Sequence, residues 1–455
     1  ITQTGALTQA GGAGAATFNG GAGVITLTQA NDFTGAVSLN NSGANNVAVT
    51  DANALVLGTS SVGTGTLTVN AVGITQTGAL TQAGGAGAAT FNGGAGVITL
   101  TQANDFTGAV SLNNSGANNV QITDSNALAL GTSGVGSGTL TVNAVGITQT
   151  GALSQAGGAG AATFNGGAGV ITLTQANDFT GAVSLNNSGA NNVAVTDTNA
   201  LVLGASSVGS GMLNITTGGT LSQTGGAVVQ AGGAGAVNIT ATAASTDIQL
   251  DTQANNFSGG VSFLTAGGGY HDIGLRNVNG GATLPVLPGG LNNLTIIFNT
   301  AAVDLPATTL TGNLVVTAGG AISQSGLLDI NGTSSFTAGA NAITLTNASN
   351  DFTGAVSLNN SGANNVAVTD SNALVLGTSG VGSGTLTVNA VGITQTGALT
   401  QAGGAGAATF NGGAGVITLT QANDFTGAVS LNNSGANNVA VTDANALVLG
   451  TSSVG

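Results

Sequence analysis

The residue types that most often carry chemistry lie together in one short stretch of this sequence. Tyr270, His271 and Arg276 are the only Tyr, His and Arg of the 455 residues, and Asp272 lies between them. A phenol, an imidazole, a carboxylate and a guanidinium this close together could form a recognition site for a polar ligand. Three Gly residues precede the group and an apolar segment follows it. We therefore expect a surface loop that carries no chemistry, with ligand recognition by Tyr270, His271, Asp272 and Arg276 as the alternative.

The same stretch is the one place where an enzyme would find its functional groups. A polysaccharide lyase or hydrolase would have to combine Asp272 with Asp247 or Asp251 and a basic group beside them. The rest of the chain contains no His, Lys, Arg or Cys, on which acid–base, Schiff-base and thiol chemistry depend. We therefore expect a protein that is not an enzyme and has no catalytic residue, and a polysaccharide-active enzyme is the last alternative.

Two Asp residues recur in each regular repeat and are the candidates for metal binding. In the first repeat they are Asp32 and Asp51, and four nearby side chains could complete a calcium site: Asn31, Asn45, Asn46 and Asn53. The alternative is that each Asp lies in a turn and accepts hydrogen bonds from the local backbone. A calcium-roll signature is approached at Gly11, but Ala16 stands where Asp is required. We favour the turn role and expect no cofactor and no metal ion, with calcium as the alternative.

Thr and Asn also recur at regular spacing. Thr26 and Thr28 form a Thr-x-Thr pattern of the kind that binds ice on a flat parallel face, although Thr is also a common outward residue of strands. The pairs Asn40–Asn41 and Asn45–Asn46 suit stacked amide hydrogen bonds between neighbouring strands. We expect a structural role for the Asn residues and keep ice binding as an alternative for Thr.

The composition of the chain excludes several classes of partner. One Lys or Arg against 15 Asp or Glu gives a net charge of −14, so almost nothing could neutralise the phosphates of a nucleic acid. The absence of Cys excludes disulfides and zinc–thiolate sites. No apolar run reaches the roughly 18 residues of a membrane-spanning helix, so we expect no transmembrane segment. Charged residues are only 4% of the chain, against about 25% in ordinary soluble domains.

Internal repeats explain this unusual composition. A long segment that begins at Ile1 recurs unchanged at Ile74, with one substitution at Ile147, and again at Ile393. The predicted units are residues 1–73, 74–146, 147–220, a divergent unit with an insertion at 221–321, then 322–392 and 393–455. We expect all of them to form one continuous solenoid. The last copy stops in the middle of a repeat, which we interpret as a window from a longer array.

Within one repeat the hydrophobic period is two, which predicts strands. Residues 24–28, 36–40 and 66–69 alternate apolar with Thr, Ser or Asn, and clusters of Gly and Asn separate the runs. Two-residue Asn-Gly links between paired strands are rare, which favours parallel over hairpin pairing. The predicted fold is all-β, a right-handed parallel β-helix with about 24 residues per coil and about three coils per repeat.

Several segments resemble the repeats of filamentous-haemagglutinin-type large exoproteins. They include GTLTVNAVGITQTGALTQ, GVITLTQANDFTGAVSL and TDANALVLGTSSVGTGTLTV, and the resemblance covers the whole chain, most loosely at residues 221–321. It implies a bacterial, extracellular β-helix that is exported across the outer membrane by two-partner secretion or as an autotransporter. It also implies use as an adhesin or as a surface fibre.

Together these observations predict a structural segment of an extracellular fibre or surface filament, acting as a rigid spacer and self-assembling scaffold. Its expected partner is itself, by lateral or end-to-end association. The first alternative is an adhesin stalk that binds a cell-surface or extracellular glycan, and no nucleic-acid partner is expected.

Overall fold

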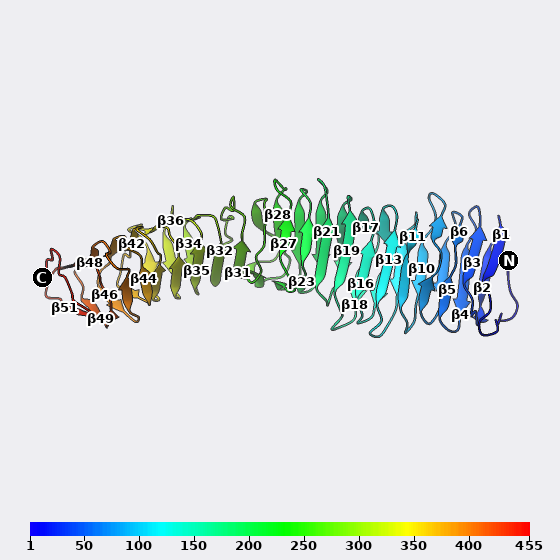
Figure 1. Ribbon diagram of the computed structural model, residues 1–455, viewed down its shortest axis with the longest axis horizontal. Helices are drawn as coiled ribbons and strands as arrows, with labels where there is room; N and C mark the ends of the chain where they lie inside the picture. The colour runs from blue at the N-terminus through cyan, green and yellow to red at the C-terminus, as the bar shows by residue number, and fades with distance from the viewer. The chain divides into compact units, whose positions relative to one another are not determined.

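The computed structural model describes residues 1–455, which form strands and no helix. The chain divides into two compact units, Ile1–Thr242 and Ala243–Gly455. In each unit the strands pair in parallel and stack as a β-solenoid, an arrangement consistent with a right-handed parallel β-helix (Figure 1). No helix long and apolar enough to cross a membrane is present. The predicted fold class is confirmed.

The strands of unit 1 form two parallel ladders, between which the chain alternates. Ladder 1 contains β1 (Ala16–Gly21), β3 (Val37–Asn41), β5 (Leu55–Leu57), β6 (Ser60–Val62), β8 (Ile74–Gln76), β9 (Leu80–Gln82), β11 (Ile98–Asn104), β13 (Val120–Asp124), β16 (Leu140–Asn143), β19 (Ala162–Gly167), β21 (Val183–Asn187), β23 (Leu201–Leu203), β24 (Ser206–Val208), β26 (Leu221–Gln223) and β27 (Val228–Gln230). Ladder 2 contains β2 (Ile25–Asn31), β4 (Val47–Asp51), β7 (Leu67–Asn70), β10 (Ala89–Asn92), β12 (Val110–Asn113), β14 (Leu128–Leu130), β15 (Ser133–Val135), β17 (Ile147–Gln149), β18 (Leu153–Gln155), β20 (Ile171–Asn177), β22 (Val193–Asp197), β25 (Leu213–Thr217) and β28 (Val237–Ala241).

The register between these strands sets the length of a turn. Seven successive pairings lead from β1 through β3, β5, β8, β11, β13 and β16 to β19. β1 and β19 are the same ATFNGG segment, two repeats apart. A repeat therefore makes three and a half turns, and this value replaces the expected three turns of about 24 residues. The intervening copy of the segment, β10, consequently lies in ladder 2.

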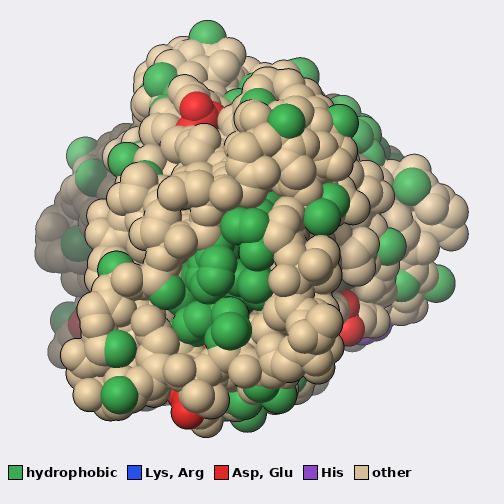
Figure 2. All heavy atoms as spheres, turned by 90° about the vertical axis from the view of Figure 1, so that its right-hand side faces the viewer, with side chains coloured by type: hydrophobic (Ala, Val, Ile, Leu, Met, Phe, Trp, Pro, Cys, Tyr) green, Lys and Arg blue, Asp and Glu red, His purple; other side chains and the backbone are tan.

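The interior of unit 1 consists of apolar side chains stacked in register. Ile98 of β11 pairs with Val120 of β13, which pairs with Leu140 of β16, and their exposed fractions are 0%, 0% and 1%. Burying such a side chain contributes about 1.5–3 kcal/mol. The end-on view shows apolar side chains gathered at the centre of the section and ringed by backbone and polar atoms (Figure 2). The stacked interior explains the two-residue hydrophobic period.

Phe residues in the core and close backbone contacts at the corners determine the cross-section of the solenoid in each regular repeat. Phe91 and Phe106 meet edge to face, with ring centroids 5.7 Å apart. At the corner beside Phe106, a Cβ added to Gly108 would lie 2.0 Å from the carbonyl oxygen of Gly87. Only Gly lets the two backbones approach this closely.

Unit 2 has strands on two sides as well. Ladder 3 contains β29 (Thr246–Leu250), β31 (Tyr270–Asn277), β32 (Asn293–Phe298), β35 (Leu314–Ala318), β38 (Ser334–Thr337), β41 (Val356–Asn359), β43 (Leu374–Leu376), β44 (Ser379–Val381), β46 (Ile393–Gln395), β47 (Leu399–Gln401), β49 (Ile417–Asn423) and β51 (Val439–Asp443). The opposite side contains β33 (Val303–Leu305), β34 (Thr308–Leu310), β36 (Ile322–Gln324), β37 (Leu328–Ile330), β39 (Ile343–Leu345), β40 (Asp351–Phe352), β42 (Val366–Thr369), β45 (Leu386–Asn389), β48 (Ala408–Gly413) and β50 (Val429–Asn433). The remaining strand of this unit is β30 (Val261–Thr265).

Candidate functional site

The only His of the chain lies at a β-bulge in ladder 3. Strands β29 and β31 pair through Thr246 with Tyr270 and through Ile248 with Ile273, so the register shifts by one residue between the two pairs. Asp247 alone therefore faces two consecutive residues, His271 and Asp272. A bulge re-aims side chains in this way. Tyr270 and Ile273 are buried, whereas the two residues between them both lie outside the core.

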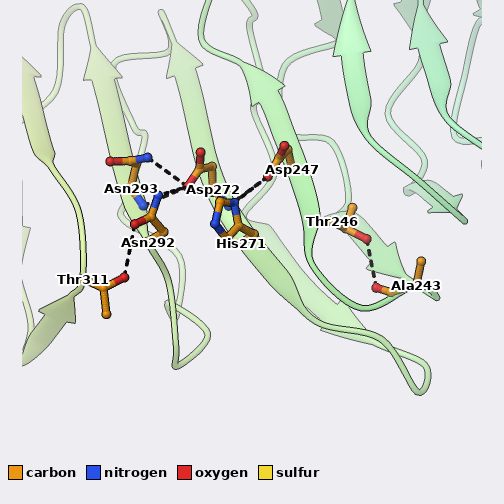
Figure 3. A network of polar contacts seen from close by, with 8 residues as sticks. All are labelled: Ala243, Thr246, Asp247, His271, Asp272, Asn292, Asn293 and Thr311. Atoms are coloured by element: carbon orange, nitrogen blue, oxygen red, sulfur yellow. Dashed lines mark hydrogen bonds and ion pairs between the residues drawn. The ribbon is translucent and has the colours of Figure 1, made fainter.

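The bulge brings one imidazole and two carboxylates into contact. His271 Nδ1 lies 3.1 Å from Asp247 Oδ1 and 3.4 Å from Asp272 Oδ1 (Figure 3). The side chain of His271 is 47% exposed, and those of Asp247 and Asp272 are 32% and 34% exposed. The backbone N–H of Asp272 also donates to Asp247 Oδ1, at 3.3 Å. Residues 24 positions apart in the sequence thus form one polar cluster on the outer face of ladder 3.

The next strand, β32, holds Asp272 in place. Asp272 Oδ1 accepts hydrogen bonds from the backbone N–H of Asn293 at 2.9 Å, from Asn293 Nδ2 at 3.1 Å and from Asn292 Nδ2 at 3.2 Å. Thr311 Oγ1 donates to Asn292 Oδ1 at 3.2 Å and so extends the network by one more turn (Figure 3). Partial burial acts to raise the pKa of Asp272, but the bonds from Asn293 and Asn292, together with His271, hold it below its ordinary value. Asp272 is therefore ionised and oriented.

The structure does not bring the other predicted site residues to this cluster. Tyr270 points to the interior, where it is 6% exposed, packs edge to face on Phe263 and donates its hydroxyl proton to the carbonyl oxygen of Leu264. Arg276 lies further along β31, where its Nε donates to Asn299 Oδ1 at 3.0 Å.

The prediction of a surface loop at these residues is wrong. Residues 270–277 form a strand, β31, that pairs with β29 on one side and β32 on the other. Asp251, one of the other carboxylates considered for an enzyme, follows the end of β29 and lies against Gly274. Asp247 is the cluster member that the sequence did not single out for recognition. The signal for the bulge was present, since two polar residues in succession interrupt the alternation between Tyr270 and Ile273.

The second of the two recurring Asp residues acts as a turn cap. Asp51 is 3% exposed, and its carboxylate accepts the backbone N–H of Phe33 at Oδ2 and that of Asn53 at Oδ1, both at 2.8 Å. The preceding Asp32 accepts a side-chain hydrogen bond from Asn53 at 3.2 Å. The turn role predicted for Asp51 is confirmed. The calcium alternative stays a prediction.

A natural substitution shows that the cap does not need a charge. Asn277 occupies the position of the capping Asp in the divergent unit. Its Oδ1 accepts the N–H groups of Phe257 and Asn279 at 3.1 and 3.0 Å, and its Nδ2 donates to the carbonyl oxygen of Phe257 at 3.0 Å. In the regular repeats, burial raises the pKa of Asp124 and Asp197 above the ordinary carboxyl value, against the hydrogen bonds that they accept.

The predicted ladder of Asn side chains is confirmed for Asn40 and its equivalent in the second repeat, Asn113. Asn70 Nδ2 donates to Thr50 Oγ1 at 3.1 Å, Asn92 Nδ2 to Asn70 Oδ1 at 2.7 Å and Asn113 Nδ2 to Asn92 Oδ1 at 2.9 Å. The backbone N–H of Gly134 then donates to Asn113 Oδ1 at 3.0 Å and ends the row. The row runs along the outer face of ladder 2, and two equivalent rows follow ladder 1, one through Asn40 and one through Asn165.

The other Asn residues of these pairs bind backbone at the corners. Asn41 Nδ2 donates to the carbonyl oxygen of Asn45, and Asn41 Oδ1 accepts the N–H of Gly63. Asn45 Nδ2 donates to the carbonyl oxygen of Ala22, and Asn46 Oδ1 accepts the N–H of Thr66. These side chains connect successive turns, so their role is structural.

The outward Thr residues do not form an unbroken row. Along ladder 2 the outward position in register is occupied by Thr26, Ala48, Thr68, Thr90 and Ser111. The row is mixed because strands of different sequence stack on one another within a repeat of three and a half turns.

Most of the chain matches one known family of repeats. Residues 1–40, 44–113, 117–186, 190–264, 291–359 and 363–432 match a family described as repeats of unknown function (DUF5649). The chain belongs to this family. No curated protein and no solved structure shows a significant match. The DUF5649 repeats leave residues 265–290 unmatched, and His271, Asp272 and Arg276 all lie in this interval. Two members of the polar cluster, His271 and Asp272, therefore lie outside the matched repeats, whereas Asp247 lies within the matched range 190–264.

Proposed function

We propose that this chain is a non-enzymatic structural scaffold, a segment of an extracellular fibre or surface filament that acts as a spacer and assembles with copies of itself. The observation that carries the proposal is the sameness of successive repeats. The segments that begin at Ile1, Ile74 and Ile147 present the same core residues, the same Asn rows and the same Asp caps. A repeat of this kind adds length and adds no unique pocket.

The stacking mechanism supports the scaffold role. Every turn offers the next one a row of backbone donors and acceptors and a stack of apolar side chains, and rows of Asn amides connect some of the turns. Stability in such an array is close to a sum of terms within a turn and between neighbouring turns. With three and a half turns per repeat and about 4.8 Å per turn, each regular repeat adds about 17 Å along the stack.

The extracellular location is part of the proposal, and the resemblance to filamentous-haemagglutinin-type exoproteins supports it. The chain has no Cys, so no disulfide can form in it before export and block passage through a pore. The low content of charged residues also suits lateral contact between copies, because few charges must be desolvated.

Electron microscopy of the producing cells tests this proposal. Antibodies against the regular repeats should label filaments outside the cell, and genes with one repeat added should give segments about 17 Å longer per repeat. A matched control carries an insertion of equal length in a flexible Gly/Ser sequence, which should not extend the ordered segment. Label confined to the cell interior, or a length independent of repeat number, would overturn the proposal.

A second candidate function is an adhesin stalk that binds a neutral glycan, and the Asn rows favour it. A shallow hollow beside one row is lined by Asn165, Asn186, Ser188 and Ser207, and an equivalent hollow recurs in unit 2 beside Asn432. Each amide in a row retains hydrogen-bonding capacity toward solvent, which pairs of sugar hydroxyls can match. Retention on immobilised neutral polysaccharide that falls in an Asn186→Ala variant would support this candidate, and equal retention would exclude it.

A further inference from the structure

We infer that Asp247, His271 and Asp272 bind one divalent transition-metal ion of the zinc class. They form the one group of three metal-ligating side chains in the chain, and their candidate ligand atoms lie within 4.8 Å of one another. The proposed site does not depend on the scaffold function: His271 and Asp272 lie in residues 265–290, which the family repeats leave unmatched, and Asp247 lies in the matched range 190–264.

The distances in the cluster suit a common ion. Zinc lies about 2.0–2.2 Å from His nitrogen and carboxylate oxygen, so two ligands of one tetrahedral ion are separated by about 3.3–3.6 Å. His271 Nδ1 lies 3.1 Å from Asp247 Oδ1 and 3.4 Å from Asp272 Oδ1. These are also hydrogen-bond distances to a ring N–H. To bind an ion through Nδ1, the neutral ring carries its proton on Nε2.

The carboxylates keep free oxygens while their positions are fixed. Asp272 Oδ1 accepts the three bonds from Asn292 and Asn293, and Asp247 Oδ1 accepts the backbone N–H of Asp272. The Oδ2 atom of each carboxylate makes no hydrogen bond, so each carboxylate has a second oxygen available to an ion beside the Oδ1 atom that faces His271 (Figure 3). Outer hydrogen bonds that orient a ligating carboxylate are a regular part of metal sites. The bulge supplies two of the three ligands from consecutive residues, which a regular strand would point to opposite faces.

The ligand set selects the class of ion. One imidazole and two carboxylates suit zinc and its neighbours in the first transition row, whereas calcium takes oxygen ligands only. The three side chains come from one face of ladder 3 and are each about a third to a half exposed. Water can therefore complete the coordination shell from the open side.

The single His of the chain gives a direct test by NMR. Zinc is titrated into the untagged full chain at neutral pH, and the imidazole proton signals belong to His271 alone. We expect these signals to shift and saturate at one zinc per chain, and calcium at the same concentration to leave them unchanged. Titration calorimetry on His271→Ala and Asp272→Asn variants should show affinity for zinc reduced at least about tenfold. Asp304→Asn, which alters another outward carboxylate of unit 2, is the matched control and should bind as the parent does.

Two results would overturn the inference. One is an imidazole signal that does not move at saturating zinc. The other is equal zinc affinity in the parent and the His271→Ala variant, which would place the bound ion on other carboxylates. His271 is half exposed, so its loss should leave the fold intact, and unchanged circular dichroism in the presence of chelator verifies this.

Discussion

Replacing the capping Asp of the second repeat tests how successive turns are connected. Asp124 is 3% exposed, and its carboxylate accepts the backbone N–H of Phe106 at 2.7 Å and that of Asn126 at 2.8 Å. Asp124→Ala leaves both donors without a partner inside the fold. Asp124→Asn can adopt the arrangement of Asn277, in which one amide oxygen accepts both N–H groups.

The two variants should differ widely in the local free energy of unfolding. Each buried donor left without a partner costs about 1–3 kcal/mol, and removing a carboxylate whose pKa burial has raised returns part of that cost. We expect a net loss of about 3 kcal/mol for Asp124→Ala, which is roughly a 150-fold rise in the opening equilibrium. Asp124→Asn should remain within about 1 kcal/mol of the parent.

Native-state hydrogen exchange is the suitable assay, because a repeat array opens locally and one melting temperature would average over all turns. The amides of Phe106 and Asn126 should lose protection in Asp124→Ala and keep it in Asp124→Asn. The same amides in the third repeat, at Phe179 and Asn199, serve as the internal reference. Equal protection in Asp124→Ala and the parent would refute the capping argument, and a large loss in Asp124→Asn would show that the charge is needed.

Two further predictions concern acid and register. Burial raises the pKa of Asp197 in the folded state, so the ionised carboxylate destabilises the fold at neutral pH, and this effect disappears as the pH falls through that raised pKa. Asp272 has a lowered pKa, so its carboxylate stabilises the fold at neutral pH, and this effect is lost as the pH falls below about 3.8. Protection factors of the neighbouring amides, which correct each exchange rate for its intrinsic pH dependence, should therefore move in opposite directions between pH 6 and pH 3, and parallel changes would contradict these assignments. For the register, Thr68 and Thr90 are paired outward residues, so a double Cys variant should form a disulfide in air, whereas Thr66 with Thr90, the spacing of a 24-residue coil, should not. Efficient closure of the second pair would refute the three-and-a-half-turn repeat.

The strands could be predicted from the sequence, but the number of turns per repeat could not. Alternation of apolar and polar residues in segments such as 24–28 follows directly from one face being buried. The stacking order does not follow, because the offset between paired residues varies with the corner between them. Leu55 pairs with Ile74 at an offset of 19 residues, and Ile74 pairs with Ile98 at an offset of 24. Short strands separated by a bend, such as β8 and β9, also count as one side of a turn.

Only part of the candidate site could be predicted from the sequence, and the reason is similar. His271 and Asp272 are adjacent in the chain, and their rarity in this composition drew attention to them. Asp247 joins them through a strand pairing with a shifted register, which depends on the backbone of two different turns. Tyr270 is next to them in the sequence, but the pleat of β31 directs its side chain into the core.

Because each repeat makes three and a half turns, successive repeats of the regular array begin on opposite sides of the solenoid. β1 and β10 carry the same sequence in neighbouring repeats but lie in opposite ladders of unit 1. Recombination between identical copies can add or remove one repeat without creating a new junction, since each repeat meets the same successor. Adding or removing an odd number of repeats nevertheless rotates the later repeats of the array by half a revolution about the stacking axis. Adding or removing an even number leaves their orientation unchanged. A gene of this kind can thus reverse the side on which a distal feature is presented while every local contact stays the same.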